Sequence, residues 1–338
     1  MSMGGIIAET KWLAVGYRNR KRIYTVMKGI SLQARRGELV ALIGRNGTGK
    51  STLLRTLVGL QPALEGEIML DGRTLRDAGS SELPRVVSFV STEPVAVRNI
   101  MVRDVVALGR FPYTNWIGTR TAADDDAVTA ALEATGMARL ADRSIDSISD
   151  GERQRTLIAR SLAQDTGLLV MDEPTAFLDL PSRYGIVSLL RSLTRDKGKC
   201  VIYSTHDLDT AINEADRIWL MTGEGVSDGA PEDLMLKGSL ASAFESPLLS
   251  FSLNDGTFSF IRSRRSTVTL EGRGKAAKLT ARALARCGYT TGPDAGLIIK
   301  VSEGSHGTGW TVTAGGTEHS YSSLYDLVAS LPENDQSA

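Results

Sequence analysis

The 338-residue sequence predicts an α/β protein built around a mostly parallel sheet. Short, continuous apolar runs are typical of strands that are covered on both faces. These runs alternate with helical stretches, which indicates crossover helices between parallel strands. We expect strands at Leu39–Ile43, Val86–Val90, Leu168–Met171, Val201–Tyr203 and Ile218–Met221. We expect helices at Ser51–Gly59, Asp124–Thr135, Glu152–Ala163, Ser182–Arg195 and Leu208–Ala215.

The hydrophobic pattern differs at the two ends of the sequence. Ile6–Tyr17 and Met27–Ala34 are short, partly alternating runs that predict antiparallel strands beside the main sheet. A turn signal, Asn254-Asp255-Gly256, then separates a first domain, residues 1–256, from a small α+β domain, residues 257–338. In that second domain we expect strands at Thr267–Leu270, Leu297–Val301 and Trp310–Thr313, and helices at Lys275–Cys287 and Leu324–Leu331.

Composition limits the classes of function. Lysine plus arginine and aspartate plus glutamate number 39 each, so the net charge is zero and we expect no nucleic-acid partner. Two isolated cysteines, Cys200 and Cys287, favour reduced thiols over a disulfide framework or a metal site. No apolar run approaches the roughly 20 residues that cross a bilayer, and no signal peptide is evident. Any membrane role is therefore expected to be peripheral, through a partner.

The strongest motif is Gly44-Arg45-Asn46-Gly47-Thr48-Gly49-Lys50-Ser51, which fits the P-loop pattern G-x-x-x-x-G-K-[ST]. An apolar strand precedes it and a helix follows. Glycines let the backbone turn tightly, so that N–H groups converge on phosphate oxygens at a helix N-terminus. Lys50 is predicted to contact the β- and γ-phosphates, and the Ser51 hydroxyl to bind Mg²⁺.

A second motif carries two acids at the end of a predicted strand. Leu168–Met171 runs into Asp172 and Glu173, which matches the Walker B pattern. Open α/β sheets bind ligands at the carboxyl ends of their strands. We expect Asp172 to hold Mg²⁺ through its water shell, and Glu173 to polarise the attacking water.

Further motifs resemble those of ATP-binding cassette (ABC) ATPases, in the family's order. Ser147-Ile148-Ser149-Asp150-Gly151-Glu152 resembles the signature written LSGGQ, with Ile148, Asp150 and Glu152 departing from it. Phe177-Leu178-Asp179 resembles the D-loop, and Ser204-Thr205-His206 resembles the switch histidine. The resemblance covers roughly residues 6–250. It implies a P-loop NTPase with a mixed sheet, an antiparallel β subdomain and a helical signature subdomain.

The resemblance also implies roles for single residues. In the family an aromatic residue stacks on adenine, and a second copy of the ATPase covers the phosphates in a head-to-tail dimer. Here Tyr17 would be that aromatic, and Glu173 and His206 the catalytic pair. Mg²⁺ and ATP are the implied cofactors. The ATP-binding residues would be Tyr17, Gly44, Arg45, Asn46, Gly47, Thr48, Gly49, Lys50, Ser51 and Thr52; Ser149, Asp150, Gly151 and Glu152 would act on the partner's ATP, with Asp179 in the D-loop.

One family feature is missing. The family carries a glutamine after the strand that follows the P-loop helix, where it touches Mg²⁺ and faces the membrane partner. Thr92 occupies that position here, and Glu93 follows it. We expect Thr92 to act as the metal ligand, with Glu93 as the alternative.

The segment Ala107-Leu108-Gly109-Arg110-Phe111-Pro112 resembles ATPase subunits that import iron–siderophore, haem and cobalamin chelates. That resemblance implies membrane permease subunits, a substrate-binding protein and a location on the cytoplasmic face of the membrane. The segment also fits a helix that ends at Gly109 with a proline beyond it. Other importers, an exporter, and an ABC ATPase of translation, repair or cluster assembly remain alternatives.

The second domain matches no ABC motif. Its predicted helix carries Lys278, Arg282 and Arg286 four residues apart on one face. Ala277, Ala281, Leu284 and Cys287 are expected to form the inward face. The basic face is interpreted as solvated, with a regulatory or dimer-supporting domain, or a contact with lipid headgroups, as alternatives.

Overall fold

The computed structural model describes residues 4–19, 22–77, 79, 82–91, 99–114, 118–253, 256–262, 265–304 and 307–332. Contacts divide the chain into two compact units. The first comprises Met1–Glu245 and Phe251–Thr257, and the second comprises Ser246–Ser250 and Phe258–Ala338. Each unit is described by itself. Within the described ranges, no helix is both long and apolar enough to span a bilayer.

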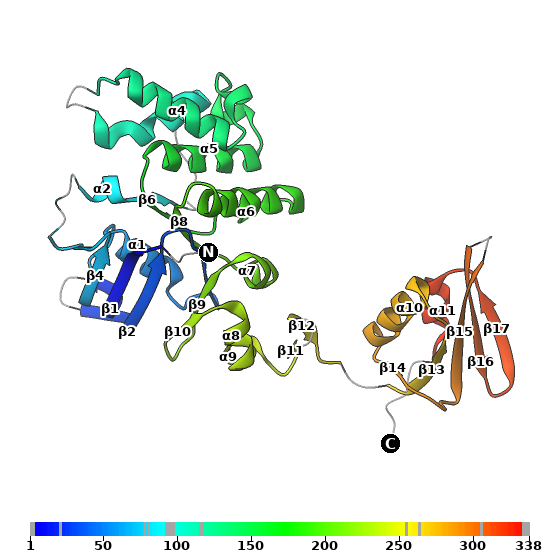
Figure 1. Ribbon diagram of the computed structural model, residues 1–338. Coiled ribbons are helices and arrows are strands. Elements are labelled where there is room, and N and C mark those ends of the chain that lie inside the picture. The colour runs from blue at the N-terminus through cyan, green and yellow to red at the C-terminus, as the bar shows by residue number, and fades with distance from the viewer. Residues whose placement is uncertain are drawn as a thin grey trace. The chain divides into compact units, whose positions relative to one another are not determined.

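The first unit contains a six-stranded sheet with the order β10-β9-β3-β8-β7-β6 (Figure 1). All neighbours are parallel except β10, which pairs antiparallel with β9. The strands are β3 (Leu39–Gly44), β6 (Val87–Val90), β7 (Leu168–Met171), β8 (Cys200–Ser204), β9 (Arg217–Met221) and β10 (Val226–Gly229). The five predicted strands are confirmed, each within one residue at either end.

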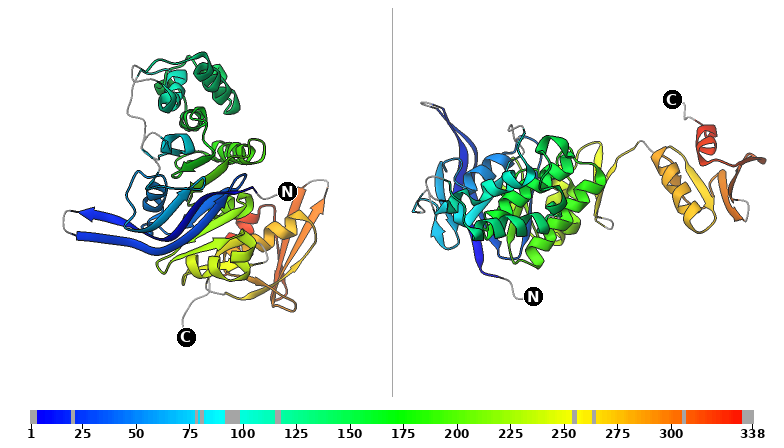
Figure 2. Two further views of the ribbon diagram at one scale, coloured as in Figure 1. Left: turned by 60° about the vertical axis from the view of Figure 1, so that its left-hand side comes forward. Right: turned by 90° about the horizontal axis from the view of Figure 1, so that it is seen from above.

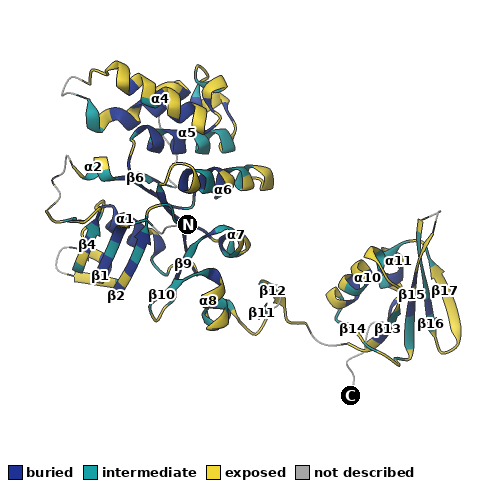
Figure 3. Cartoon of the chain, in the orientation of Figure 1, coloured by how far each residue is buried: buried dark blue, intermediate teal, exposed yellow. Residues whose placement is uncertain are grey.

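Both faces of this sheet are buried, which explains the continuous apolar runs (Figure 3). Leu39, Ala41 and Ile43 point into one core, which also holds side chains of α5, α6 and α7. Val40 and Leu42 point into the other, which holds side chains of α1, β1 and β4. The helices and 3-10 turns of this unit are α1 (Lys50–Leu57), α2 (Leu83–Val86), α3 (Val102–Ala107), η1 (Leu108–Tyr113), α4 (Ala122–Ala134), η2 (Ala138–Leu140), η3 (Ile145–Ser147), α5 (Asp150–Ala163), α6 (Leu180–Arg195), α7 (Leu208–Glu214), α8 (Pro231–Leu236) and α9 (Ser239–Phe244).

The amino-terminal strands form a separate antiparallel sheet of order β2-β1-β4-β5. β1 (Ile6–Asn19) and β2 (Arg22–Arg35) pair antiparallel along nearly their whole length, and lie side by side in both views of Figure 2. This confirms the antiparallel subdomain. The pattern did not predict β4 (Glu65–Leu70) and β5 (Arg73–Thr74), because two charged residues interrupt the short run of β4.

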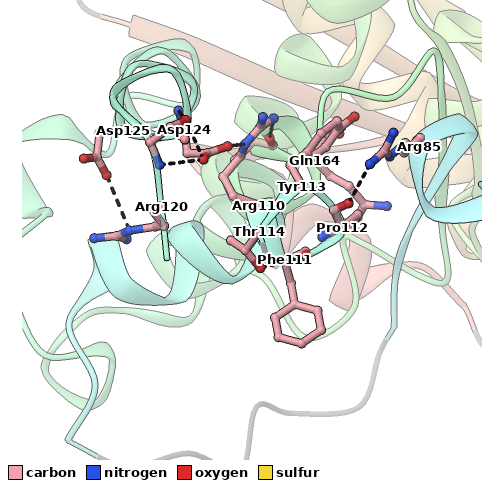
Figure 4. A network of polar contacts seen from close by, with 12 residues as sticks. Arg85, Arg110, Phe111, Pro112, Tyr113, Thr114, Arg120, Asp124, Asp125 and Gln164 are labelled. Carbon is pink, nitrogen blue, oxygen red and sulfur yellow. Dashed lines mark hydrogen bonds and ion pairs between the residues drawn. The ribbon is translucent and has the colours of Figure 1, made fainter. Parts of the chain in front are cut away.

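The helical subdomain contains α3, η1, α4 and α5. Here Arg110 is buried, donates to Asp124 at 2.8 Å and to the Ala163 carbonyl at 2.8 Å, and lies over the Tyr113 ring (Figure 4). A Cβ on Gly109 would lie 2.1 Å from the Arg160 carbonyl oxygen, so only glycine allows this approach to α5. The alternative interpretation of this segment, a helix that ends at Gly109, is wrong, because α3 ends at Ala107 and the chain continues as the 3-10 helix η1 to Tyr113.

In the second unit a five-stranded sheet of order β14-β13-β15-β16-β17 packs against two helices. Val268, Leu284, Ile299 and Leu327 form its core. The hairpin turn at Gly315-Gly316, which leads to β17, was missed. The elements are β13 (Thr267–Glu271), α10 (Lys275–Arg286), β14 (Thr290–Thr291), β15 (Leu297–Gly304), β16 (Gly307–Ala314), β17 (Thr317–Tyr321) and α11 (Leu324–Ser330), with the pair β11 (Leu249–Ser252) and β12 (Thr257–Phe260) at the junction of the units.

The inward face of α10 differs from the expectation at four positions. Thr280 and Ala283 are buried with Ala277 and Leu284, whereas Ala281 and Cys287 are only half-buried. The Thr280 hydroxyl accepts a hydrogen bond from the Trp310 indole at 2.8 Å, which compensates the burial of both polar groups.

The buried ion pair of the helical subdomain predicts a pH dependence. Hydrogen bonds from Thr121 and Arg110 lower the pKa of Asp124 to about 2. Because the folded-state pKa lies below that of the unfolded chain, the pair stabilises the fold above about pH 4 and this contribution is lost as pH falls toward about 2. Asp124→Asn should therefore flatten the fall of the thermal midpoint in that range, measured by circular dichroism.

The matched control is Asp125→Asn on the same helix, since Asp125 forms only an exposed pair with Arg120 at 3.4 Å. That variant should keep the wild-type slope. Equal slopes in Asp124→Asn and wild type would contradict this account of the helical subdomain.

Candidate active site

The loop between β3 and α1 has the shape that its sequence predicts. Gly49 has φ +102°, and a Cβ there would lie 2.3 Å from Val26 Cγ1, so this position requires glycine. The Thr48 hydroxyl donates to the Arg45 carbonyl at 2.9 Å and holds the turn closed. Arg45 points away along the surface and donates to the Glu245 carbonyl at 3.2 Å. Asn46 and Gly47 are exposed at the tip.

Lys50 begins α1 and is buried under the loop. Its ammonium donates to the carbonyls of Gly44 at 2.8 Å and Arg45 at 3.2 Å. Burial lowers the pKa of Lys50, while the carboxylates of Glu173 and Asp172 act in the opposite direction. A cation held against the loop, beside two acids, is the arrangement that suits a bound phosphate and its metal ion.

Two predicted ATP contacts, Tyr17 and Thr52, meet in the structure. The Tyr17 hydroxyl and Thr52 Oγ1 lie 2.6 Å apart, which ties the end of β1 to the first turn of α1. The Tyr17 side chain is nevertheless 52% exposed. Its ring is therefore fixed at one end and open to a planar ligand.

The two acids follow β7, and β8 positions them. The Ser204 hydroxyl donates to Asp172 Oδ1 at 2.7 Å and accepts from the Glu173 N–H at 2.8 Å. Asp172 is 2% exposed. Parallel pairing places Met171 opposite Tyr203 and Leu42 opposite Ser204, so the ends of β7, β8 and β3 meet at one edge of the sheet.

Glu173 has an unusual backbone. Its φ is +48°, in the left-handed region that costs a non-glycine residue on the order of 1–2 kcal/mol. Strain of this kind is concentrated at functional sites. The Glu173 carboxylate lies against His206, whose Nε2 is 2.5 Å from Glu173 Oε1.

The signature segment begins α5 with a capping box. The Ser149 N–H and hydroxyl both donate to Glu152 Oε2 at 2.9 Å, and Ser149 Oγ accepts from the Glu152 N–H at 3.3 Å. Glutamate and glutamine serve equally in this motif, so the departure at Glu152 preserves the helix start. Arg153 pairs with the other acidic departure, Asp150, at 2.9 Å.

The predicted site residues fall into separate groups. Lys50 of the P-loop interacts with the charges of Asp172 and Glu173, and Glu173 contacts His206, so these groups converge. No hydrogen bond within the described ranges joins the signature segment to the P-loop. Asp179 caps α6 by accepting from the Ser182 N–H at 3.0 Å, and hydrogen bonds from Ser182 lower its pKa. Thr92 and Glu93 lie outside the described residues. Sequence reasoning missed Ser204, although its place directly before Thr205-His206 at a strand end was a signal.

These features define a P-loop NTPase. An ABC transporter family model matches residues 27–176, and an iron ABC transporter C-terminal domain model matches residues 265–332. Together with the relatives described next, these matches show that the chain belongs to the ATP-binding proteins of ABC transporters, a family of transport ATPases.

Curated relatives support the same assignment. The chain is 36% identical to the achromobactin transport ATP-binding protein CbrD of Dickeya dadantii over 69% of its own length and 85% of the relative. It is 38% identical to the ferric enterobactin transport ATP-binding protein FepC of Escherichia coli over 66% and 81%. It is 32% identical to the iron(3+)-hydroxamate import ATP-binding protein FhuC of Bacillus subtilis over 70% and 87%.

Solved structures share the fold. The ATP-binding cassette MJ0796, determined as a dimer in a post-hydrolysis state with ADP and phosphate, is 26% identical, with a TM-score of 0.58. That match covers 67% of this chain and 99% of the cassette. The cbiO1 protein of Clostridium perfringens, part of the cbiONQ transporter complex, is 27% identical, with a TM-score of 0.60, over 70% of this chain and 93% of that one.

The Ser204 hydroxyl, which bridges Asp172 and the Glu173 N–H, is expected to set the Mg²⁺ requirement of the site. Ser204→Ala should raise the Mg²⁺ concentration for half-maximal ATPase activity about 10-fold, because Asp172 loses the donor that orients it. ATP binding, measured by equilibrium dialysis without Mg²⁺, should change little.

Ser88→Ala is the control. Ser88 is a buried hydroxyl on β6 that pairs with Ser161 at 2.5 Å, so its loss tests the general effect of a buried hydroxyl on a neighbouring strand. If both variants shift the Mg²⁺ requirement alike, Ser204 has no special role at Asp172.

Proposed function

We propose that the chain is the ATP-hydrolysing subunit of an importer for metal chelates such as iron–siderophores, haem or cobalamin. The main support is the match of the second domain to the iron ABC transporter C-terminal domain. The first domain adds a complete P-loop and the acids Asp172 and Glu173. Relatives named for siderophore transport support the same class of cargo.

The nucleotide site is proposed to form on the P-loop, residues 44–51. Backbone N–H groups at the start of α1 would receive the phosphates, and Lys50 would release its two carbonyl partners to pair with them. Thr52 would keep Tyr17 in place for the adenine ring. The remaining proposed ATP contacts are Gly44, Arg45, Asn46, Gly47, Thr48 and Gly49.

Mg²⁺ suits the donors at this edge of the sheet. Asp172 offers a buried carboxylate oriented by Ser204, and Ser51 offers a hydroxyl at the start of α1. A bound Mg²⁺ supplies charge neutralisation at the phosphates and takes few protein ligands, with phosphates and water completing its shell. Thr92 is proposed as a further ligand on sequence grounds alone.

Glu173 is proposed to orient and polarise the attacking water. The strained backbone of Glu173 and the hydrogen bond from its N–H to Ser204 fix the main chain from which the Glu173 side chain extends. His206 lies against that carboxylate and would turn to the γ-phosphate when nucleotide binds. The Glu173 side chain is 29% exposed and the His206 side chain 44% exposed, so each has room for this rearrangement.

A second copy of the chain is proposed to complete the site. Ser149 and the N–H groups at the start of α5, with Asp150, Gly151 and Glu152, would face the partner's ATP. Arg153 would limit the repulsion between Asp150 and the phosphates. Asp179, at the start of α6, would lie in the same interface.

Coupling to transport requires partners outside this chain. We propose membrane permease subunits, a substrate-binding protein delivering the chelate, and a position on the cytoplasmic face of the membrane. The test is co-purification of a permease, followed by ATPase assay in liposomes with a ferric-siderophore-loaded binding protein. Stimulation by the loaded protein supports the proposal, while co-purification with ribosomes or DNA instead of a permease would refute it.

Glu173→Gln should bind ATP and form a stable dimer, seen by size-exclusion chromatography with light scattering, while turnover falls about 10²- to 10⁴-fold. Glu224→Gln, an exposed acid in the turn between β9 and β10, is the control and should retain activity. Normal turnover in Glu173→Gln would remove this residue from its proposed role.

A further inference from the structure

The second unit carries a surface pocket of about 500 Å³ at the carboxyl-terminal ends of its two helices. Arg262, Arg265 and Arg286 line one part of it, whereas Val328, Ala329 and Leu331 of the α11 region line another. Its volume lies within the range of small-molecule sites.

Contacts at and just beyond the end of α10 position two of the three arginines, Arg262 and Arg265. Arg262 Nη1 donates to the Ala285 carbonyl at 3.1 Å. Arg265 donates from its backbone N–H to the Gly288 carbonyl at 2.8 Å, and its guanidinium lies 5.8 Å from the centre of the Tyr289 ring. Since each guanidinium has five N–H donors, most of their donors are not used by these contacts.

The salt bridges of the described residues leave these three charges without a carboxylate partner. Among the residues that the structure describes, none of the three arginines forms an ion pair with a carboxylate. The carboxyl end of α10 offers only about half a unit of negative charge. Three positive charges at one pocket therefore exceed what the helix terminus compensates.

We propose that this pocket binds a small oxyanion, a phosphate or carboxylate group carried by a compound with an apolar part. The planar guanidinium matches such oxygens in a two-pronged geometry. The apolar lining from Val328, Ala329 and Leu331 would cover the remainder of the ligand. The oxyanion belongs either to a free metabolite or to a lipid headgroup. The site is independent of the nucleotide site and does not require the proposed function.

Cys287 lines the pocket and serves as its reporter. The other cysteine, Cys200, is buried, and burial raises its pKa, so it reacts little with thiol reagents. The experiment measures labelling of Cys287 in the folded full-length chain by a neutral aromatic disulfide, with inorganic phosphate against sodium chloride at equal ionic strength. We expect phosphate to slow labelling about threefold or more.

Variants separate the site from general surface charge. Arg286→Gln should abolish most of the protection, whereas Arg282→Gln, an exposed position one turn earlier on α10 outside the pocket lining, should retain it. Arg262→Gln is a second pocket variant, in case Arg286→Gln disturbs the helix. Equal protection in all variants, equal loss in Arg282→Gln and Arg286→Gln, or no protection in wild type by phosphate or anionic vesicles would overturn the proposal.

The source of the oxyanion is distinguished with vesicles. Protection by vesicles of phosphatidylglycerol and phosphatidylcholine, but not of phosphatidylcholine alone, identifies a lipid headgroup. Protection by free phosphate alone identifies a soluble ligand. Because labelling needs no ATP hydrolysis, failure here leaves the proposed ATPase role untouched.

Discussion

The Ser204 hydroxyl is the contact on which the arrangement of the site depends. It donates to Asp172 and accepts from the Glu173 N–H, and so joins the ends of two adjacent parallel strands. This geometry exists only because β8 lies between β3 and β7 in the sheet. The P-loop, the metal-binding candidate and the water-orienting candidate therefore share one edge, although more than 100 residues separate Lys50 from Asp172 in the sequence.

Burial on both faces of the sheet makes this edge rigid. Alternate residues of β3 point into two different cores, so a shift of the strand by one residue would exchange every side chain between them. The strain at Glu173 is sustained by this rigid frame. A rigid catalytic edge, together with an exposed Ser149 at the start of α5, fits the proposal that two copies of the chain close on bound nucleotide.

Much of the central fold could be predicted from the sequence, because buried parallel strands leave continuous apolar runs. The P-loop and the acids after β7 were also readable from local pattern. The role of Ser204 was missed because it depends on contacts with the neighbouring strand, and its place at a strand end before Thr205-His206 was the one local signal. β17 was missed because its residues are almost all polar, and β4 because two glutamates interrupt its short apolar run; tertiary contacts decide the pairing of both strands.

The capping box explains a departure that the sequence alone left open. Glu152 occupies the place of the family's glutamine and makes the reciprocal bonds that start α5. Residues 92–98 lie outside the described residues, so the role of Thr92 stays a prediction.

The central claim is that one chain's P-loop works with the signature of a second copy. The most direct measurement mixes two inactive variants, Lys50→Ala and Ser149→Arg. In a mixed dimer both defects fall in one composite site and the other site is intact, so equal mixing should restore about a quarter of the wild-type sites. Recovery of ATPase activity on mixing is the predicted result. Activity that stays at the level of the separate variants, with mixed dimers demonstrated by light scattering and affinity tags, would contradict the account.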